Sequence, residues 1–134
     1  MAVAVTTRGD GSAPASVVNA GVLNHPTTAE PIVGFVARGD AKKLANIRLR
    51  PRVTVVFRSG WEWVTVEGQA ELAGPDDALD GMEHDALAQL LREVYASAVG
   101  GDPEAWAELD DVFLAERHTA VLVRPSRIYS NPAQ

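Results

Sequence analysis

Two adjacent lysines, Lys42 and Lys43, stand where a short helix is expected to begin, and they are the residues best suited to chemistry in this chain. Asp40 precedes them as a predicted N-cap, and Leu44 and Ile47 follow at the spacing of one buried helix face. Cationic side chains in the first turn oppose the helix dipole by about 0.3 to 1 kcal/mol each, whereas the free N–H groups there attract anions. The pattern predicts a phosphate site at this helix start. The alternative is that both lysines point into solvent and Asp40 offsets their charge.

The basic residues of the chain are concentrated around these lysines. Seven of the twelve lie within positions 38–58, whose only acid is Asp40, whereas positions 62–116 hold fifteen acids and a single base, Arg92. The net charge of the whole chain is -6. This distribution indicates a local anion site and no nucleic-acid surface, because binding a polyanion needs a broad positive face. A solvated basic face that pairs with acidic helices is the alternative.

Trp61 and Trp63 are two positions apart in a predicted strand, so they are expected to share one face of it. Side by side they would form either a wall for a planar ring or part of a subunit interface, since aromatic residues are enriched in both. The two interpretations are compatible if a ligand lies between subunits.

The sequence contains no residue set that would carry covalent or acid–base catalysis. It has no cysteine, which excludes disulfides, thiolate nucleophiles and cysteine metal sites, and its three histidines, His25, His84 and His118, are scattered. No metal site is expected, and no nucleophile–base pair or phosphate-loop motif can be named. We therefore name no catalytic residue, and any redox chemistry would come from a bound cofactor.

Length and composition are typical of one globular domain over residues 1–134. No apolar run approaches the roughly 20 residues that span a bilayer, and the first residues lack the pattern of a secretion signal. We expect a cytoplasmic protein that binds neither membrane nor nucleic acid.

Alternating apolar residues between turn signals predict six strands, over 2–8, 15–23, 32–37, 53–57, 61–72 and 119–129. The short helix that begins with the lysines lies between the third and fourth strands and ends before Pro51. Two helices are predicted before the last strand: one carries Leu87, Leu90, Leu91 and Val94 at helical spacing, and one begins at Asp102 and Pro103. The elements indicate a mainly β, antiparallel barrel with helical additions.

The segment over 34–68 resembles the flavin/deazaflavin oxidoreductase family, which is related to pyridoxamine 5'-phosphate oxidase, and within it the actinobacterial branch that uses coenzyme F420. The resemblance rests on the order and spacing of Lys43, Asn46, Pro51-Arg52-Val53 and Trp61. It implies the FMN-binding split barrel, a six-stranded antiparallel split β-barrel.

The resemblance also implies a homodimer with the cofactor in a groove between subunits. Lys43 would hold the phosphate with Lys42 and Asn46 beside it, and Trp61 would reach over from the partner subunit. The cofactor ring would lie against two neighbouring strands, at Pro14, Ala15 and Ser16 on one and at Val36, Ala37 and Arg38 on the other.

The activity implied is that of an F420-dependent oxidoreductase, which transfers a hydride between the deazaflavin and a small conjugated acceptor such as an enone or quinone. Relatives that bind FMN carry a serine where Ala41 stands and an arginine where Lys42 stands, and this difference favours F420 over FMN. The alternatives are an FMN-binding oxidase of the pyridoxamine-phosphate-oxidase type and a non-catalytic F420 carrier or storage protein.

Overall fold

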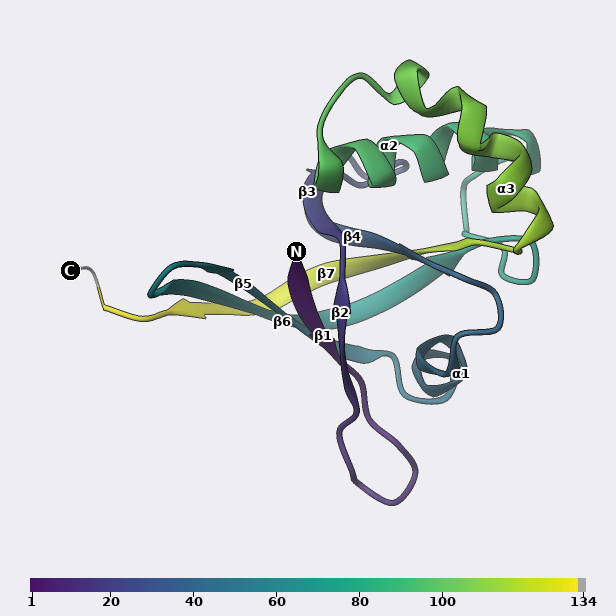
Figure 1. The fold of residues 1–134 in the computed structure, drawn as a ribbon. Helices are drawn as coiled ribbons and strands as arrows, with labels where there is room; N and C mark the ends of the chain where they lie inside the picture. The colour runs from purple at the N-terminus through teal and green to yellow at the C-terminus, as the bar shows by residue number, and fades with distance from the viewer. Residues whose placement is uncertain (133–134) are drawn as a thin grey trace.

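The computed structural model describes residues 1–132, which form one antiparallel sheet and a set of helices (Figure 1). The strands are β1 (Ala2–Val5), β2 (Ala15–Val18), β3 (Ala20–Asn24), β4 (Pro31–Ala37), β5 (Arg52–Ser59), β6 (Glu62–Ala73) and β7 (Thr119–Ser130). The helices are α1 (Lys42–Leu49), α2 (Leu87–Val99) and α3 (Asp110–Ala115), with 3-10 turns η1 (His84–Ala86) and η2 (Pro103–Leu109) before α2 and α3.

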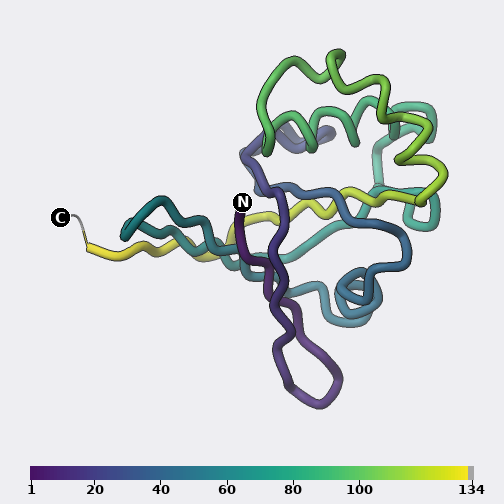
Figure 2. Tube along the Cα trace, viewed as in Figure 1, coloured from purple at the N-terminus to yellow at the C-terminus, as the bar shows by residue number. Residues whose placement is uncertain are grey.

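The strands follow the order β2-β1-β5-β6-β7-β4-β3, and every neighbouring pair is antiparallel. The sheet curls strongly, as the tube in Figure 2 shows. The β5–β6 hairpin and the end of β7 extend together as an arm away from the curled part (Figure 1). The predicted mainly β antiparallel fold is confirmed.

The prediction of six strands was wrong, because the single strand expected over 15–23 is divided at Asn19. Val18 pairs with Ala2 of β1, whereas Ala20 pairs with Phe35 of β4, at the opposite end of the strand order. The chain stays extended on both sides of Asn19 and changes its partner strand there. A strand's hydrophobic pattern reports which face is buried and not which neighbour it pairs with, so the change of partner left no signal in the sequence.

Two hydrophobic cores lie on opposite faces of the strands. In the barrel core, Leu44 and Ile47 of α1 pack with Phe35 and the inward-facing valines of β5 and β7. In the second core, Val94 of α2 packs with outward-facing residues of β4 and β7 such as Leu122. The inner and outer faces of β4 and β7 are therefore both buried, and α1 is fixed to the barrel by its apolar face.

The first helix begins at Lys42, as the sequence pattern indicates, but the predicted N-cap was wrong. Ala41 occupies the N-cap, and no side chain caps the helix. The amide of Ala41 donates to the carbonyl of Arg38 (3.0 Å), which forms a tight turn. That turn leaves the Asp40 carboxylate 3.6 Å from Nε of Arg38 instead of over the helix start.

The predicted cap of the last helical segment is confirmed: Asp102 accepts a hydrogen bond from the amide of Glu104 (3.0 Å), and Pro103 follows it. The strand predicted over 61–72 begins one residue later, at Glu62. Within residues 1–132, no helix is long and apolar enough to cross a membrane.

Candidate functional site

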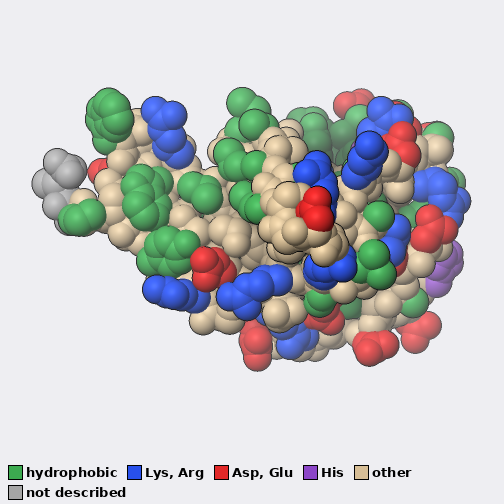
Figure 3. Space-filling view, turned by 90° about the horizontal axis from the view of Figure 1, so that it is seen from below, with side chains coloured by type: hydrophobic (Ala, Val, Ile, Leu, Met, Phe, Trp, Pro, Cys, Tyr) green, Lys and Arg blue, Asp and Glu red, His purple; other side chains and the backbone are tan. Residues whose placement is uncertain are grey.

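A pocket of about 230 Å³ lies between the start of α1 and the β1–β2 hairpin, and we call it the basic pocket. Three of its lining side chains are cationic and none is acidic. Its lining residues are Ala4, Thr6, Arg8, Pro14, Ala15, Ser16, Lys42, Lys43 and Asn46. Figure 3 views the molecule from the side of α1 and the hairpin, where lysine and arginine side chains stand out from the surface.

Lys43 is the half-buried cation of the basic pocket. Burial lowers the pKa of its ammonium group, because the charged form loses hydration. Among the residues that the structure describes, no carboxylate lies within 4 Å of Lys43 or of the more exposed Lys42. A partly desolvated ammonium without a counterion would be stabilised by an anion in the pocket.

The first turn of α1 adds to this preference for an anion. It contains no acidic residue and no capping side chain; the amide of Leu44 donates to the carbonyl of Ala41 (3.1 Å), which leaves the amides of Lys42 and Lys43 to meet a ligand. Leu44 and Ile47 are almost completely buried in the barrel core. They fix the helix, and therefore fix where Lys42 and Lys43 stand.

The opposite wall of the basic pocket is the hairpin loop that follows β1. Nη1 of Arg8 donates to Oγ of Ser12 (3.2 Å), while Oδ1 of Asp10 accepts from both the amide (2.9 Å) and the hydroxyl (2.6 Å) of Ser12. These hydrogen bonds lower the pKa of Asp10. The guanidinium of Arg50 lies against Gly9 of the same loop. The loop is thus ordered by its own polar contacts and presents Arg8 to the pocket.

Six of the residues named from the sequence come together here: Pro14, Ala15, Ser16, Lys42, Lys43 and Asn46 all line the basic pocket. Ala4, Thr6 and Arg8 also line it, and the sequence analysis did not select them. The alternation of side chains along a strand is the signal that would have indicated them. Residues 4, 6 and 8 lie on the same side of the chain wherever it is extended.

The other strand named from the sequence lies elsewhere. Val36 and Ala37 are in β4, where Val36 packs against the second core and Ala37 is buried in the barrel core. Arg38 follows β4 and lies 3.6 Å from Asp40 and 3.8 Å from Glu116. None of these three residues lines the basic pocket.

The two tryptophans do not form a wall within one chain. Trp61 precedes β6 in the β5–β6 turn and is 88% exposed, whereas Trp63 contacts the edge of the Tyr129 ring, with centroids 6.1 Å apart. Nδ2 of Asn131 donates to the carbonyl of Trp61 (2.9 Å), which holds this turn against the end of the chain. The exposed Trp61 ring is therefore displayed at the tip of the arm.

An apolar groove runs between the base of this arm and the β3–β4 hairpin. Val22, Val64 and Ile128 line it, and they are 65%, 40% and 62% exposed. Pro31, Phe57 and Pro125 complete an almost wholly apolar surface. Figure 3 shows hydrophobic side chains gathered along the arm. Exposed apolar surface of this extent is typical of protein interfaces.

The geometry of the basic pocket suits the binding of a phosphate or another anion. Its lining contains no histidine, aspartate or glutamate to act as a general acid or base. Its volume is below the roughly 300 to 1,000 Å³ of pockets that enclose a whole ligand, so it accommodates one end of a larger molecule.

No protein-family model and no curated protein matches the sequence. The structure is similar to protein Atu2129 from Agrobacterium tumefaciens, with a TM-score of 0.64 and 15% identity over 97% of this chain and 50% of that one. It is similar to a pyridoxamine 5'-phosphate oxidase-related, FMN-binding protein from Nostoc punctiforme (TM-score 0.65, 15% identity, 96% of this chain and 72% of that one). It is also similar to an F420 reductase (TM-score 0.56, 16% identity, 96% of this chain and 87% of that one).

These similarities extend over almost the whole described chain, at identities that establish the fold alone. The aligned part covers 96% of this chain for both the FMN-binding protein and the F420 reductase, so it includes nearly all of the curled antiparallel sheet and of the helices described above. The chain has the split β-barrel fold of pyridoxamine 5'-phosphate oxidase-related proteins.

Proposed function

We propose that the basic pocket binds the phosphate of a flavin-type cofactor, and that the cofactor is coenzyme F420. The observation that carries the proposal is Lys43, a half-buried ammonium with no carboxylate within 4 Å among residues 1–132. Arg8 and Lys42 stand on either side of the same pocket, so three cations would surround a bound phosphate. Charge-assisted hydrogen bonds of this kind are among the stronger ones in proteins.

The shape of the pocket supports a site that is completed by a second subunit. Val36, Ala37 and Arg38 lie outside the basic pocket, and Trp61 is displayed at the tip of the arm. We propose a homodimer that buries the apolar groove and brings the partner's Trp61 to the cofactor ring. A buried groove of valine, isoleucine and proline side chains would contribute the apolar contact that an obligate interface needs.

The proposed activity is that of an oxidoreductase in the cytoplasm that reduces a small conjugated acceptor such as an enone or quinone. When bound, the deazaflavin would supply the hydride, and the proton that completes the reduction of the acceptor would come from solvent water, so no acid or base from the protein is needed. The chain's own residues bind and orient: Lys43 and Arg8 hold the phosphate end, and the backbone of β2 from Ala15 to Ser16 borders the path toward the ring. This fits a pocket whose lining contains no histidine, aspartate or glutamate.

The Nostoc protein that shares the fold binds FMN, so FMN is the competing cofactor. Parallel fluorescence titrations of the cofactor-free protein with F420 and with FMN separate the two. We expect F420 to bind more tightly. Tighter binding of FMN would replace the proposal with an FMN-binding oxidase, and failure of both to bind would remove it.

A second experiment separates an enzyme from a carrier. Stopped-flow spectroscopy follows the oxidation of reduced F420 by a panel of enones and quinones, with and without the protein. We expect at least one acceptor to react faster with the bound cofactor. If F420 binds but no acceptor reacts faster than with free cofactor, the protein is a carrier or storage protein.

A further inference from the structure

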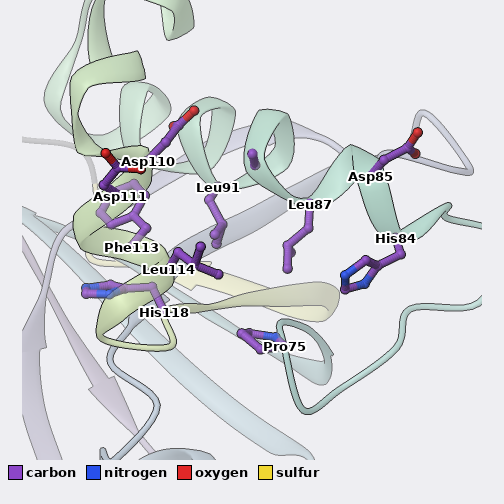
Figure 4. Close-up of a pocket in the computed structure, with 11 residues that line it drawn as sticks. Pro75, His84, Asp85, Leu87, Leu91, Asp110, Asp111, Phe113, Leu114 and His118 are labelled. Carbon is purple, nitrogen blue, oxygen red and sulfur yellow. The ribbon is translucent and has the colours of Figure 1, made fainter.

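A second pocket, distinct from the basic pocket, lies between α2, α3 and the turn that follows β6 (Figure 4). We call it the helical pocket. Its volume is about 370 Å³, at the lower end of the range for small-molecule sites, and it shares no lining residue with the basic pocket. In Figure 1 the helices that form it stand on the opposite side of the sheet from α1.

The interior of the helical pocket is apolar. In Figure 4, Leu91 of α2 points toward Leu114 of α3, and Leu87 points toward the turn that carries Pro75. Leu114 is 70% exposed although it stands over this cavity. A flat apolar body placed between the two helices would remove these side chains from water, which favours binding in proportion to the area covered.

Apart from two histidines, His84 and His118, the titratable side chains that line the helical pocket are all acidic. Three aspartates, Asp85, Asp110 and Asp111, line it, and no lysine or arginine does. Asp110 is partly balanced by Arg92, whose Nε lies 3.4 Å from Oδ1. Within residues 1–132, no cationic side chain lies within 4 Å of Asp85 or Asp111.

His118, the half-buried histidine that follows α3, does not offset this charge. His118 contacts the Phe113 ring, with centroids 4.8 Å apart, and its Nδ1 is buried without a hydrogen-bond partner among the described residues. Burial lowers the pKa of His118, which favours the neutral imidazole. The helical pocket therefore combines an apolar interior with an uncompensated negative edge.

We propose that the helical pocket binds a small organic cation, an amine whose apolar body consists of one or two rings. The rings would lie between Leu87, Leu91 and Leu114, and the ammonium group would meet Asp85 or Asp111 at the edge. An anion with the same rings would be repelled by the same carboxylates. The two pockets of this protein thus have opposite charge preferences, anionic ligands for the basic pocket and cationic ones for the helical pocket.

Three probes with one ring system test the charge preference directly: tryptamine, 3-methylindole and indole-3-propionate. Binding is measured by calorimetry and located by the methyl resonances of Leu87, Leu91 and Leu114 in NMR spectra. We expect tryptamine to shift these resonances and to bind about tenfold more tightly than indole-3-propionate at low salt, with 3-methylindole between them. Equal binding of the three probes, or no binding of any, would overturn the proposal.

Variants test the location. Ala88 lines the helical pocket from an exposed position, so Ala88→Trp should fill it and abolish tryptamine binding, whereas Ala105→Trp, also exposed and outside the lining, should not. Replacing Asp85 and Asp111 together by asparagine should remove the preference for tryptamine over 3-methylindole. The matched control replaces Asp80 and Glu108, two exposed acids outside the lining, by their amides and should keep that preference.

These results do not depend on the proposed cofactor. Lys43→Ala alters only the basic pocket and should leave tryptamine binding unchanged. If Ala88→Trp does not fold, as judged by circular dichroism, the comparison of the three probes on the unaltered chain still decides. Tryptamine binding that survives Ala88→Trp in a folded protein would place the cation elsewhere and contradict the proposal.

Discussion

Nδ2 of Asn46 donates a hydrogen bond to Oγ1 of Thr6 (3.3 Å) and so joins α1 to the residue that follows β1, although the two residues are 40 positions apart. The bond crosses the basic pocket from the helix that carries Lys42 and Lys43 to the strand that leads to Arg8. It therefore fixes the two cationic walls of the pocket relative to each other before any ligand arrives.

Lys43→Ala should weaken F420 binding by about 10- to 150-fold, because a charge-assisted bond to phosphate contributes roughly 1.5 to 3 kcal/mol. The melting temperature of the cofactor-free protein should stay level or rise slightly, since the change removes a half-buried cation from the first helical turn. Titration and calorimetry measure the two effects. Arg52→Ala, which removes an exposed cation outside the pocket, is the control and should leave affinity unchanged.

An affinity within twofold of the unaltered protein in Lys43→Ala, measured at low salt, would mean that Lys43 is simply a solvated lysine. It would also remove the phosphate from the basic pocket and with it the main support for the proposed site.

Arg8→Ala should also weaken F420 binding, and by less than Lys43→Ala, because Arg8 is exposed and its interaction with phosphate is screened by solvent. The loss should shrink as salt is added. Titrations at low and high ionic strength measure this. Arg8→Lys keeps the charge and should retain most of the affinity; if it binds as weakly as Arg8→Ala, the charge of Arg8 does not contribute.

Affinity for F420 should fall as the pH rises toward 10.5, the ordinary pKa of lysine. Burial lowers the pKa of Lys43, so its ammonium loses the proton below that pH, and the attraction to phosphate is lost with the charge. The attraction is therefore strongest at the low end of this pH range, where the ammonium keeps its proton. Titrations in steps from pH 7 to 10 measure the effect, and the fall should be much smaller in Lys43→Ala.

The protein should be a homodimer of about 29 kDa by light scattering, twice the 14.3 kDa of one chain. Ile128→Asp places a charge in the exposed apolar groove and should yield a folded monomer with weakened F420 binding. Leu49→Asp, a change at an exposed apolar residue outside the groove, should leave the dimer intact. A 14 kDa monomer that binds F420 tightly would contradict both the dimer and the shared site.

Gly68→Ala should destabilise the fold by about 3 kcal/mol or more, as overpacking in a closely packed interior does. Gly68 is buried at the register shift between β6 and β7, and a Cβ there would overlap with the carbonyl oxygen of Arg124. Urea denaturation measures the loss. Gly60→Ala is the comparison: its φ of +60° makes alanine strained by about 1 kcal/mol, but the Cβ would stand in open space. Similar losses for both would show that the bulge at Gly68 adapts.

The sequence predicts local structure well where one residue pattern determines it. Leu44 and Ile47 mark the buried face of α1, and Asp102 with Pro103 marks the start of η2, because each signal depends on neighbours along the chain. The change of partner strand at Asn19 depends on where β1 and β4 lie in space, and neighbouring residues do not carry that information.

The candidate site shows the same contrast between features that neighbouring residues determine and features that distant contacts determine. Lys42 and Lys43 were found because they begin one helix, and Asn46 was found through the family resemblance. Arg8 was not selected, since its approach to that helix depends on the hairpin loop. Asp40 has the residue type of an N-cap, but the turn that follows Arg38 places Ala41 at the cap position instead. The residue types predicted a cationic pocket. Contacts between segments distant in the sequence, the hairpin loop and α1, decided which residues line it.

The division at Asn19 also has a consequence for how the barrel is held closed. β2 and β3 are the two ends of the strand order, and a single residue, which belongs to neither ladder, links them. The barrel is therefore closed between β2 and β3 by the covalent backbone, whereas all other neighbouring strands are joined by hydrogen bonds. Cutting the backbone at Asn19 would leave every strand ladder intact and would remove the direct covalent link between the two ends of the sheet, which would then be held together by the packing of the barrel core.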